Sequence, residues 1–291
     1  MPACVSSPIT VLCTHAGSVA EPDTDLLTVL AAVPDPRGTC GRRHRLVTVL
    51  ALSVAAVLAG ARSYVAIAEW AHDLPASARL RLGMGRCAPS ESTIRRILRI
   101  VELDALDTAL SGWLTTRLPE PASAPPGPAR PIAGMIAIDG KTARGARRAE
   151  GPAVHLLAAF DHTHGVVLGQ TEVDGKTNQI TAFGPLLDRI EPRDVVVTAD
   201  ALHTQRGHAH YLHERGAHYL WIAKANQPRQ HTQLIGLPWP TIPVVHESRD
   251  RGHGRVEHRR LKLTAVGEGI GFPHAQLAIQ LHRRRPIGST T

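Results

Sequence analysis

The chain has 291 residues, which is enough for two domains of ordinary size. Hydrophobic residues make up 43% and charged residues 20%, a globular composition that excludes a disordered chain. Aromatic residues are only 3%, which argues against aromatic stacking platforms for single strands, and the net charge of +8 is compatible with a polyanionic partner.

The N-terminal part is predicted to be helical. Residues 1–34 are weakly patterned, with one short helix expected around Asp25–Val33, and residues 35–118 form a helical domain. Its longest apolar run, Leu46–Ala61, is 16 residues long and short of the ~20 that span a bilayer, so we expect a buried helix and no membrane. No secretory signal is recognised, and the four cysteines form no C-x-x-C pair, which favours a reducing cytoplasm.

A further helix is predicted to begin at Pro89-Ser90-Glu91-Ser92, with Ser90 or Ser92 as its N-cap. Its apolar residues recur at helical spacing, and three arginines lie on the opposite face: Arg95, Arg96 and Arg99. That face either contacts phosphates or is simply solvated.

Residues 119–131 are rich in proline and predict an extended linker between two domains. After it the hydrophobic period changes, and an α/β core is expected over residues 132–241. Its predicted order is strand, strand, strand, helix, strand, helix, strand, with the second and third strands forming a hairpin. These elements are Met135–Ile138, His155–Phe160, Val166–Val173, Asn178–Ile190, Asp194–Thr198, Thr204–Arg215 and Tyr219–Ala223. The order predicts a mixed sheet.

Two aspartates follow the first and fourth of these strands. Asp139 comes at the end of the first, and Asp200 comes at the end of the fourth. In a sheet of this order the two strand ends lie side by side, and paired carboxylates are good ligands for Mg²⁺ or Mn²⁺. The alternative is that each is a turn or capping residue.

The tetrapeptide Asp-Gly-Lys-Thr occurs twice, at 139–142 and 174–177. The glycine spacing of a Walker A motif is missing at both, so no nucleotide cofactor is expected. Lys141 and Lys176 remain candidates for phosphate contacts near the metal.

Residues 242–285 alternate like the strands of a small β insertion, before a tail at 286–291. The insertion is basic, and Arg251 and Arg255 are candidate DNA contacts. Glu257 is expected to be a salt-bridged strand residue. The histidines between residues 203 and 218 are expected at the surface or at caps rather than on zinc.

Several segments in this order resemble bacterial insertion-sequence transposases of the H-repeat-associated type, DDE transposases with an RNase H-like catalytic domain. The resemblance covers about Asp35 to Arg285. It is carried by Asp35-Pro-Arg, Pro89-Ser-Glu-Ser-Thr-Ile94, Ile138-Asp-Gly-Lys-Thr, Val173-Asp-Gly-Lys-Thr-Asn178, Thr198-Ala-Asp-Ala-Leu-His-Thr-Gln205, Lys224-Ala-Asn-Gln-Pro228 and Arg251-Gly-His-Gly-Arg-Val-Glu257.

The resemblance implies that Asp139 and Asp200 are the first two acids of a DDE triad. It implies metal-dependent cleavage of double-stranded DNA at element ends and transfer to a target, with a helical domain that engages DNA or a second copy of the chain. In this family the third acid lies in a segment reading Trp-x-Ile-Glu-Asn, which this sequence lacks. We therefore expect a truncated, inactive copy in which Glu257 is a weak stand-in. A non-catalytic remnant that competes for element ends is the alternative.

Overall fold

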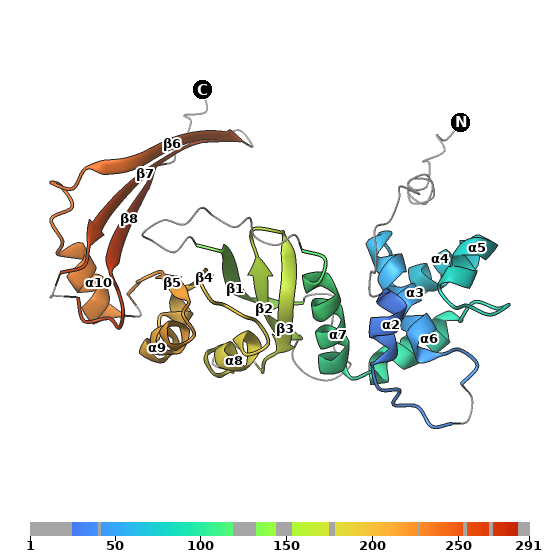
Figure 1. Cartoon of the computed structure of the whole chain (residues 1–291). Coiled ribbons are helices and arrows are strands. Elements are labelled where there is room, and N and C mark those ends of the chain that lie inside the picture. Colours follow the sequence, from blue (N-terminus) through green and yellow to red (C-terminus); the bar gives the residue numbers. More distant parts are fainter. Residues whose placement is uncertain are drawn as a thin grey trace. The chain divides into compact units, whose positions relative to one another are not determined.

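A computed structural model describes residues 25–39, 42–118, 132–143, 153–174, 178–225, 227–252, 255–267 and 270–284. The chain divides into two compact units, Met1–Pro119 and Glu120–Thr291, here called the helical unit and the sheet unit (Figure 1). The proline-rich segment 119–131 lies outside the described residues.

The helical unit is built from helices packed around the apolar helix α3. They are α2 (Leu26–Ala31), α3 (Leu46–Leu58), α4 (Tyr64–Asp73), α5 (Ala76–Arg81), α6 (Glu91–Ile100) and α7 (Leu103–Thr115). Helix α3 is the apolar run that the sequence predicted to be buried, and eight of its residues are buried. None of the described helices is long and apolar enough to cross a membrane.

Helix α6 begins as its sequence predicts. Ser90 is the N-cap, and its side chain accepts a hydrogen bond from the backbone N–H of Thr93. Ile94 and Ile97 are fully buried against the core of the helical unit, and the arginines of α6 face outward. The spacing of apolar residues therefore fixed which face of this helix carries charge.

The sheet unit contains a five-stranded mixed sheet in the order β3-β2-β1-β4-β5 (Figure 1). Strand β1 pairs antiparallel with β2 and parallel with β4; β2 pairs antiparallel with β3, and β4 pairs parallel with β5. The elements are β1 (Gly134–Thr142), β2 (His155–Asp161), β3 (Val166–Glu172), α8 (Asn178–Leu187), β4 (Val195–Ala199), the 3₁₀ turn η1 (Ala201–His203), α9 (Arg206–Glu214) and β5 (His218–Trp221). The predicted mixed α/β sheet with a helical region before it is confirmed.

One face of this sheet is covered and the other is partly open. Ile136, Ile138 and Val197 are buried with Phe183 of α8 and Leu212 of α9. The alternate residues of the strands face the other way and are less covered, and they include the exposed hydrophobic residues Met135 (39% exposed), Val167 (39%) and Leu220 (41%).

Two predicted boundaries are wrong. Strand β1 does not end at Asp139, because pairing with β2 continues to Thr142 opposite His155. The helix expected from Thr204 to Arg215 begins two residues later, at Arg206, after the short η1 turn that Asp200 caps. Local periodicity reports neither pairing with a distant strand nor a short capped turn before a helix.

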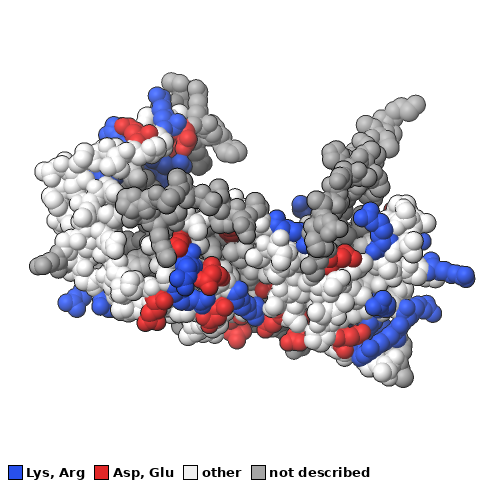
Figure 2. Space-filling model, in the orientation of Figure 1, with Lys and Arg blue, Asp and Glu red and all other residues white. Residues whose placement is uncertain are grey.

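A second sheet of three antiparallel strands follows, in the order β6 (Val244–Gly252), β7 (Arg255–Ala265) and β8 (Leu277–Arg284), after helix α10 (Pro228–Ile235). Figure 2 shows basic and acidic atoms interleaved over this sheet. Its ion pairs join Arg259 to Asp250 and Arg260 to Glu247, so the basic character of the sequence is partly neutralised here.

Candidate active site

The two predicted aspartates occupy matching positions on adjacent strands. The last paired residues of β1 and β4 are Ile138 and Ala199, which lie opposite each other in parallel register. Asp139 follows Ile138 and Asp200 follows Ala199, so both aspartates lie at the same end of neighbouring strands. Because Ile138 and Ala199 are buried against the covered face, the aspartates belong to the open face.

Both carboxylates are reachable from solvent. Asp139 is 60% exposed, and its Oδ2 atom lies 3.5 Å from Nζ of Lys141, which stands two residues along the same strand and face. Asp200 accepts a hydrogen bond of 2.9 Å from the backbone N–H of Leu202, so its carboxylate is held at the start of η1. The capping role expected for a lone aspartate is therefore present at Asp200 and leaves its second oxygen available.

The opposite side of β1 is braced directly behind Asp139. A Cβ atom on Gly140 would lie 2.4 Å from Nε2 of Gln179, which is buried at the start of α8. The amide nitrogen of Gln179 contacts Nε2 of His155, and Nδ1 of His155 lies 2.9 Å from the hydroxyl of Thr142. If the amide donates to Nε2, Nδ1 carries the proton and donates to Thr142. These side-chain contacts connect α8 to both β1 and β2 behind the site.

A divalent cation fits this pair chemically. Two carboxylates on adjacent strand ends supply hard oxygen ligands, and Mg²⁺ commonly uses one or two such ligands with water and substrate phosphates. Within the described residues there is no group of three or more His, Cys, Asp or Glu side chains placed to hold a metal ion. The structure therefore brings Asp139 and Asp200 together without a third acid from that part of the chain.

Glu257 is engaged elsewhere. It lies on β7, where its carboxylate pairs with Arg259 at 3.1 Å and also with Arg283 of β8. The expectation of a salt-bridged strand residue is confirmed, and the β insertion does not bring Glu257 into a three-acid group with the aspartates.

The residues predicted to contact DNA differ in their surroundings. Arg95 pairs with Glu91 one turn earlier, whereas Arg96 lines a cavity and Arg99 is exposed. Lys176 lies outside the described residues. Arg251 belongs to strand β6 and Arg255 to strand β7, on either side of residues 253–254, which lie outside the described residues.

Two histidines expected at the surface are buried instead. His203 is 1% exposed and His208 is 8% exposed, and both pack on Phe183, with the His208 ring stacked at 4.0 Å. Burial lowers the pKa of both rings, so they are neutral core residues. The expectation of surface histidines was wrong here because a chain with few aromatic residues fills this core with imidazole rings.

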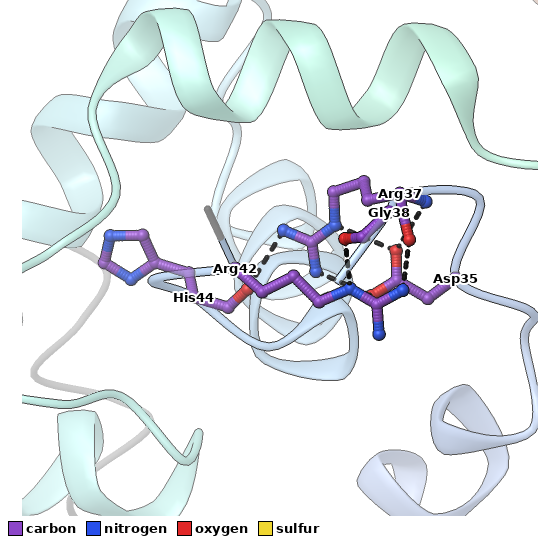
Figure 3. A network of polar contacts seen from close by, with 5 residues as sticks. All are labelled: Asp35, Arg37, Gly38, Arg42 and His44. Carbon is purple, nitrogen blue, oxygen red and sulfur yellow. Dashed lines mark hydrogen bonds and ion pairs between the residues drawn. The ribbon is translucent and has the colours of Figure 1, made fainter. Parts of the chain in front are cut away.

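A cluster of polar residues lies in the segment before α3 and was not predicted from the sequence. The guanidinium of Arg37 makes two hydrogen bonds of 2.8 Å to the carboxylate of Asp35, which with the other contacts of Asp35 lowers its pKa to about 2. Arg37 also donates to the carbonyl of His44 at 3.0 Å, and Arg42 donates to the carbonyl of Gly38 at 2.8 Å (Figure 3). The Asp-Pro-Arg motif at 35–37 was the one signal of this network.

Two family models match the chain, one in each unit. The model "DDE_Tnp_1-associated" matches residues 27–114, and the model "Transposase DDE domain" matches residues 132–286. The "Uncharacterized protein in dhlA 3'region" of Xanthobacter autotrophicus is 30% identical over 88% of this chain and 87% of its own length.

Two Escherichia coli K12 proteins are also similar. "Putative transposase YncI" is 30% identical over 71% of this chain and 80% of its own length, and "H repeat-associated putative transposase YbfD" is 28% identical over 80% and 91%. Among solved structures, a piggyBac transposase synaptic complex with hairpin DNA gives a TM-score of 0.36 at 12% identity, over 89% of this chain and 58% of that one. The family models and the relatives together show that the chain belongs to the DDE transposase family.

Proposed function

We propose that the open end of strands β1 and β4 is the site at which this transposase acts on the phosphodiester backbone of double-stranded DNA. The observation that carries the proposal is the parallel register of Ile138 with Ala199, which sets Asp139 beside Asp200 on the open face of the sheet. The "Transposase DDE domain" match covers both residues.

Asp139 and Asp200 are proposed to hold Mg²⁺ or Mn²⁺. Such an ion stabilises the negative charge on the attacking and leaving oxygens of a phosphodiester displacement. The hydrogen bond from the backbone of Leu202 keeps the carboxylate of Asp200 oriented towards the site. Lys141 competes for Asp139 when no cation is bound, and it becomes free to contact a DNA phosphate when the cation takes its place.

We further propose that this pair binds its cation but does not cut DNA by itself. The described residues supply two carboxylates at the site, and Glu257 is held by arginines on another sheet. A metal held by two side chains lacks the third fixed ligand of a DDE site. Truncation and inactivity stay predictions.

Two measurements test these statements separately. Mn²⁺ binding followed by electron paramagnetic resonance is expected for the chain and is expected to be lost in Asp139→Asn. Asp188→Asn, which changes an aspartate that accepts hydrogen bonds from Tyr211 and Arg215 of the α9 region, is the matched control. Binding that persists in Asp139→Asn would refute the metal site.

The second measurement is nicking of supercoiled plasmid with Mg²⁺ or Mn²⁺. We expect no cleavage above background. Nicking that disappears in both Asp139→Asn and Asp200→Asn would refute the inactivity and leave the site assignment standing. Joining of precleaved element ends to target DNA, measured in the same reactions, separates strand transfer from cleavage.

A further inference from the structure

The helical unit contains a basic cavity that is separate from the aspartate pair. The cavity has a volume of about 460 Å³ and lies between the segment that precedes α3 and the first turn of α6. Arg37, Arg42, Arg43 and His44 line one side, and Arg96 lines the other with Ser90 and Thr93. No acidic side chain lines the cavity in the described part of the chain. We call it the arginine pocket.

Two of its arginines are fixed by the protein. Arg37 is clamped by both carboxylate oxygens of Asp35, and it holds the carbonyl of His44 (Figure 3). Arg42 holds the carbonyl of Gly38 and lies 3.7 Å from Asp35. Asp35 therefore compensates charge on the outer side of this network, and the bonds to carbonyls shape the loop that forms the pocket wall.

The other two arginines have no such role. Arg43 and Arg96 are exposed, and the side chain of neither makes a hydrogen bond or ion pair within the described residues. They come from segments more than fifty positions apart, yet they line the same cavity. Two guanidinium groups without an acidic partner around one cavity attract an anion.

The pocket is also positive at two further points. Ser90 and Thr93 belong to the start of α6, where the helix dipole favours an anion, although the N–H of Thr93 already donates to Ser90. Burial lowers the pKa of His44, and the nearby charges of Arg43 and Arg37 lower it further. The histidine therefore reports a positive potential in the pocket.

We propose that the arginine pocket binds a phosphate of a DNA backbone. Forked guanidinium groups match phosphate oxygens, and the volume admits a phosphate with part of its sugars. Contact of this kind positions the helical unit on a duplex without reading its sequence. The choice of DNA as the source rests on the proposed function of the sheet unit.

The test uses the full chain and a fluorescent duplex of about 30 base pairs, in EDTA, so that metal binding and cleavage play no part. The test variant is Arg43→Gln/Arg96→Gln. The control is Arg62→Gln/Arg81→Gln, which removes the same charge from exposed arginines of the same unit outside the pocket. Anisotropy gives the dissociation constant between 50 and 200 mM salt.

We expect the test variant to bind about tenfold or more weakly near 100 mM salt, with a log–log salt slope smaller by about 1, since one lost phosphate contact contributes roughly 0.9. The control is expected to change affinity by less than about threefold. Equal losses in the two variants would show general charge attraction and overturn the proposal.

A second readout is the NMR titration of the His44 ring. DNA in the pocket offsets the arginine charges, so the pKa of His44 is expected to rise with duplex and to stay unchanged in the test variant. A rise with inorganic phosphate but not with duplex would assign the pocket to a free anion and overturn the proposal. Because Asp139→Asn leaves this unit intact, failure of the metal site and failure of the pocket are distinguishable.

Discussion

Replacement of Gly140 by alanine is the sharpest test of how the site is braced. The added Cβ would lie 2.4 Å from Nε2 and 2.7 Å from Cδ and Oε1 of Gln179. Gln179 is 5% exposed and bonded to His155, so its amide cannot turn to solvent without breaking a buried contact. Overpacking costs about 1–3 kcal/mol and a lost buried hydrogen bond about 1–3 kcal/mol. We expect Gly140→Ala to destabilise the sheet unit by about 3 kcal/mol.

The control is the same substitution in a Gln179→Ala background. With the amide removed, the methyl group has space, and alanine in a strand is more favourable than glycine by about 0.5–1 kcal/mol. The sign of the effect should therefore reverse. Urea unfolding is followed by tryptophan fluorescence, with Trp70 and Trp113 replaced by phenylalanine so that the signal comes from the sheet unit. An equal cost of Gly140→Ala in both backgrounds would refute the clash with Gln179.

Three further predictions concern pH, a helix cap and metal. Burial lowers the pKa of His203 below the 6.5 of an unfolded chain, so the unfolded state binds more protons as the pH falls through 6.5. The free energy of unfolding then drops by at most about 1.4 kcal/mol per pH unit. The urea midpoint should therefore fall less between pH 7.5 and 5.5 in His203→Leu, and the same fall in both proteins would contradict this prediction. The hydroxyl of Ser63 accepts a hydrogen bond of 3.1 Å from the N–H of Ala66 at the start of α4. Ser63→Ala should therefore destabilise the helical unit by about 1 kcal/mol in thermal unfolding, with Ser63→Asn close to wild type. Equal losses of stability in the two variants would exclude the cap. Mg²⁺ at about 10 mM, for a dissociation constant of about 1 mM, should stabilise the sheet unit by about 1.4 kcal/mol, and this gain should vanish in Asp139→Asn; a thermal shift that survives that substitution would place the ion elsewhere.

The sequence by itself determined which segments become helices and strands, and that an aspartate stands at the end of the apolar part of β1 and another after β4. The alternation of β2 and the apolar spacing of α6 are local properties of the chain, because they depend on backbone period and on which face is buried. The pairing of Asp139 with Asp200 also followed from the sequence, since the order of elements predicts which strands are neighbours.

The tertiary structure alone decided how residues distant in the chain meet. It brings Arg96 to the same cavity as Arg43, requires glycine at Gly140 because Gln179 lies behind it, and buries His203 against Phe183. It also joins Glu257 of β7 to Arg283 of β8, on a sheet separate from the aspartates. None of these contacts has a period or a spacing that marks it, because each depends on packing between elements whose relative position only the complete fold sets.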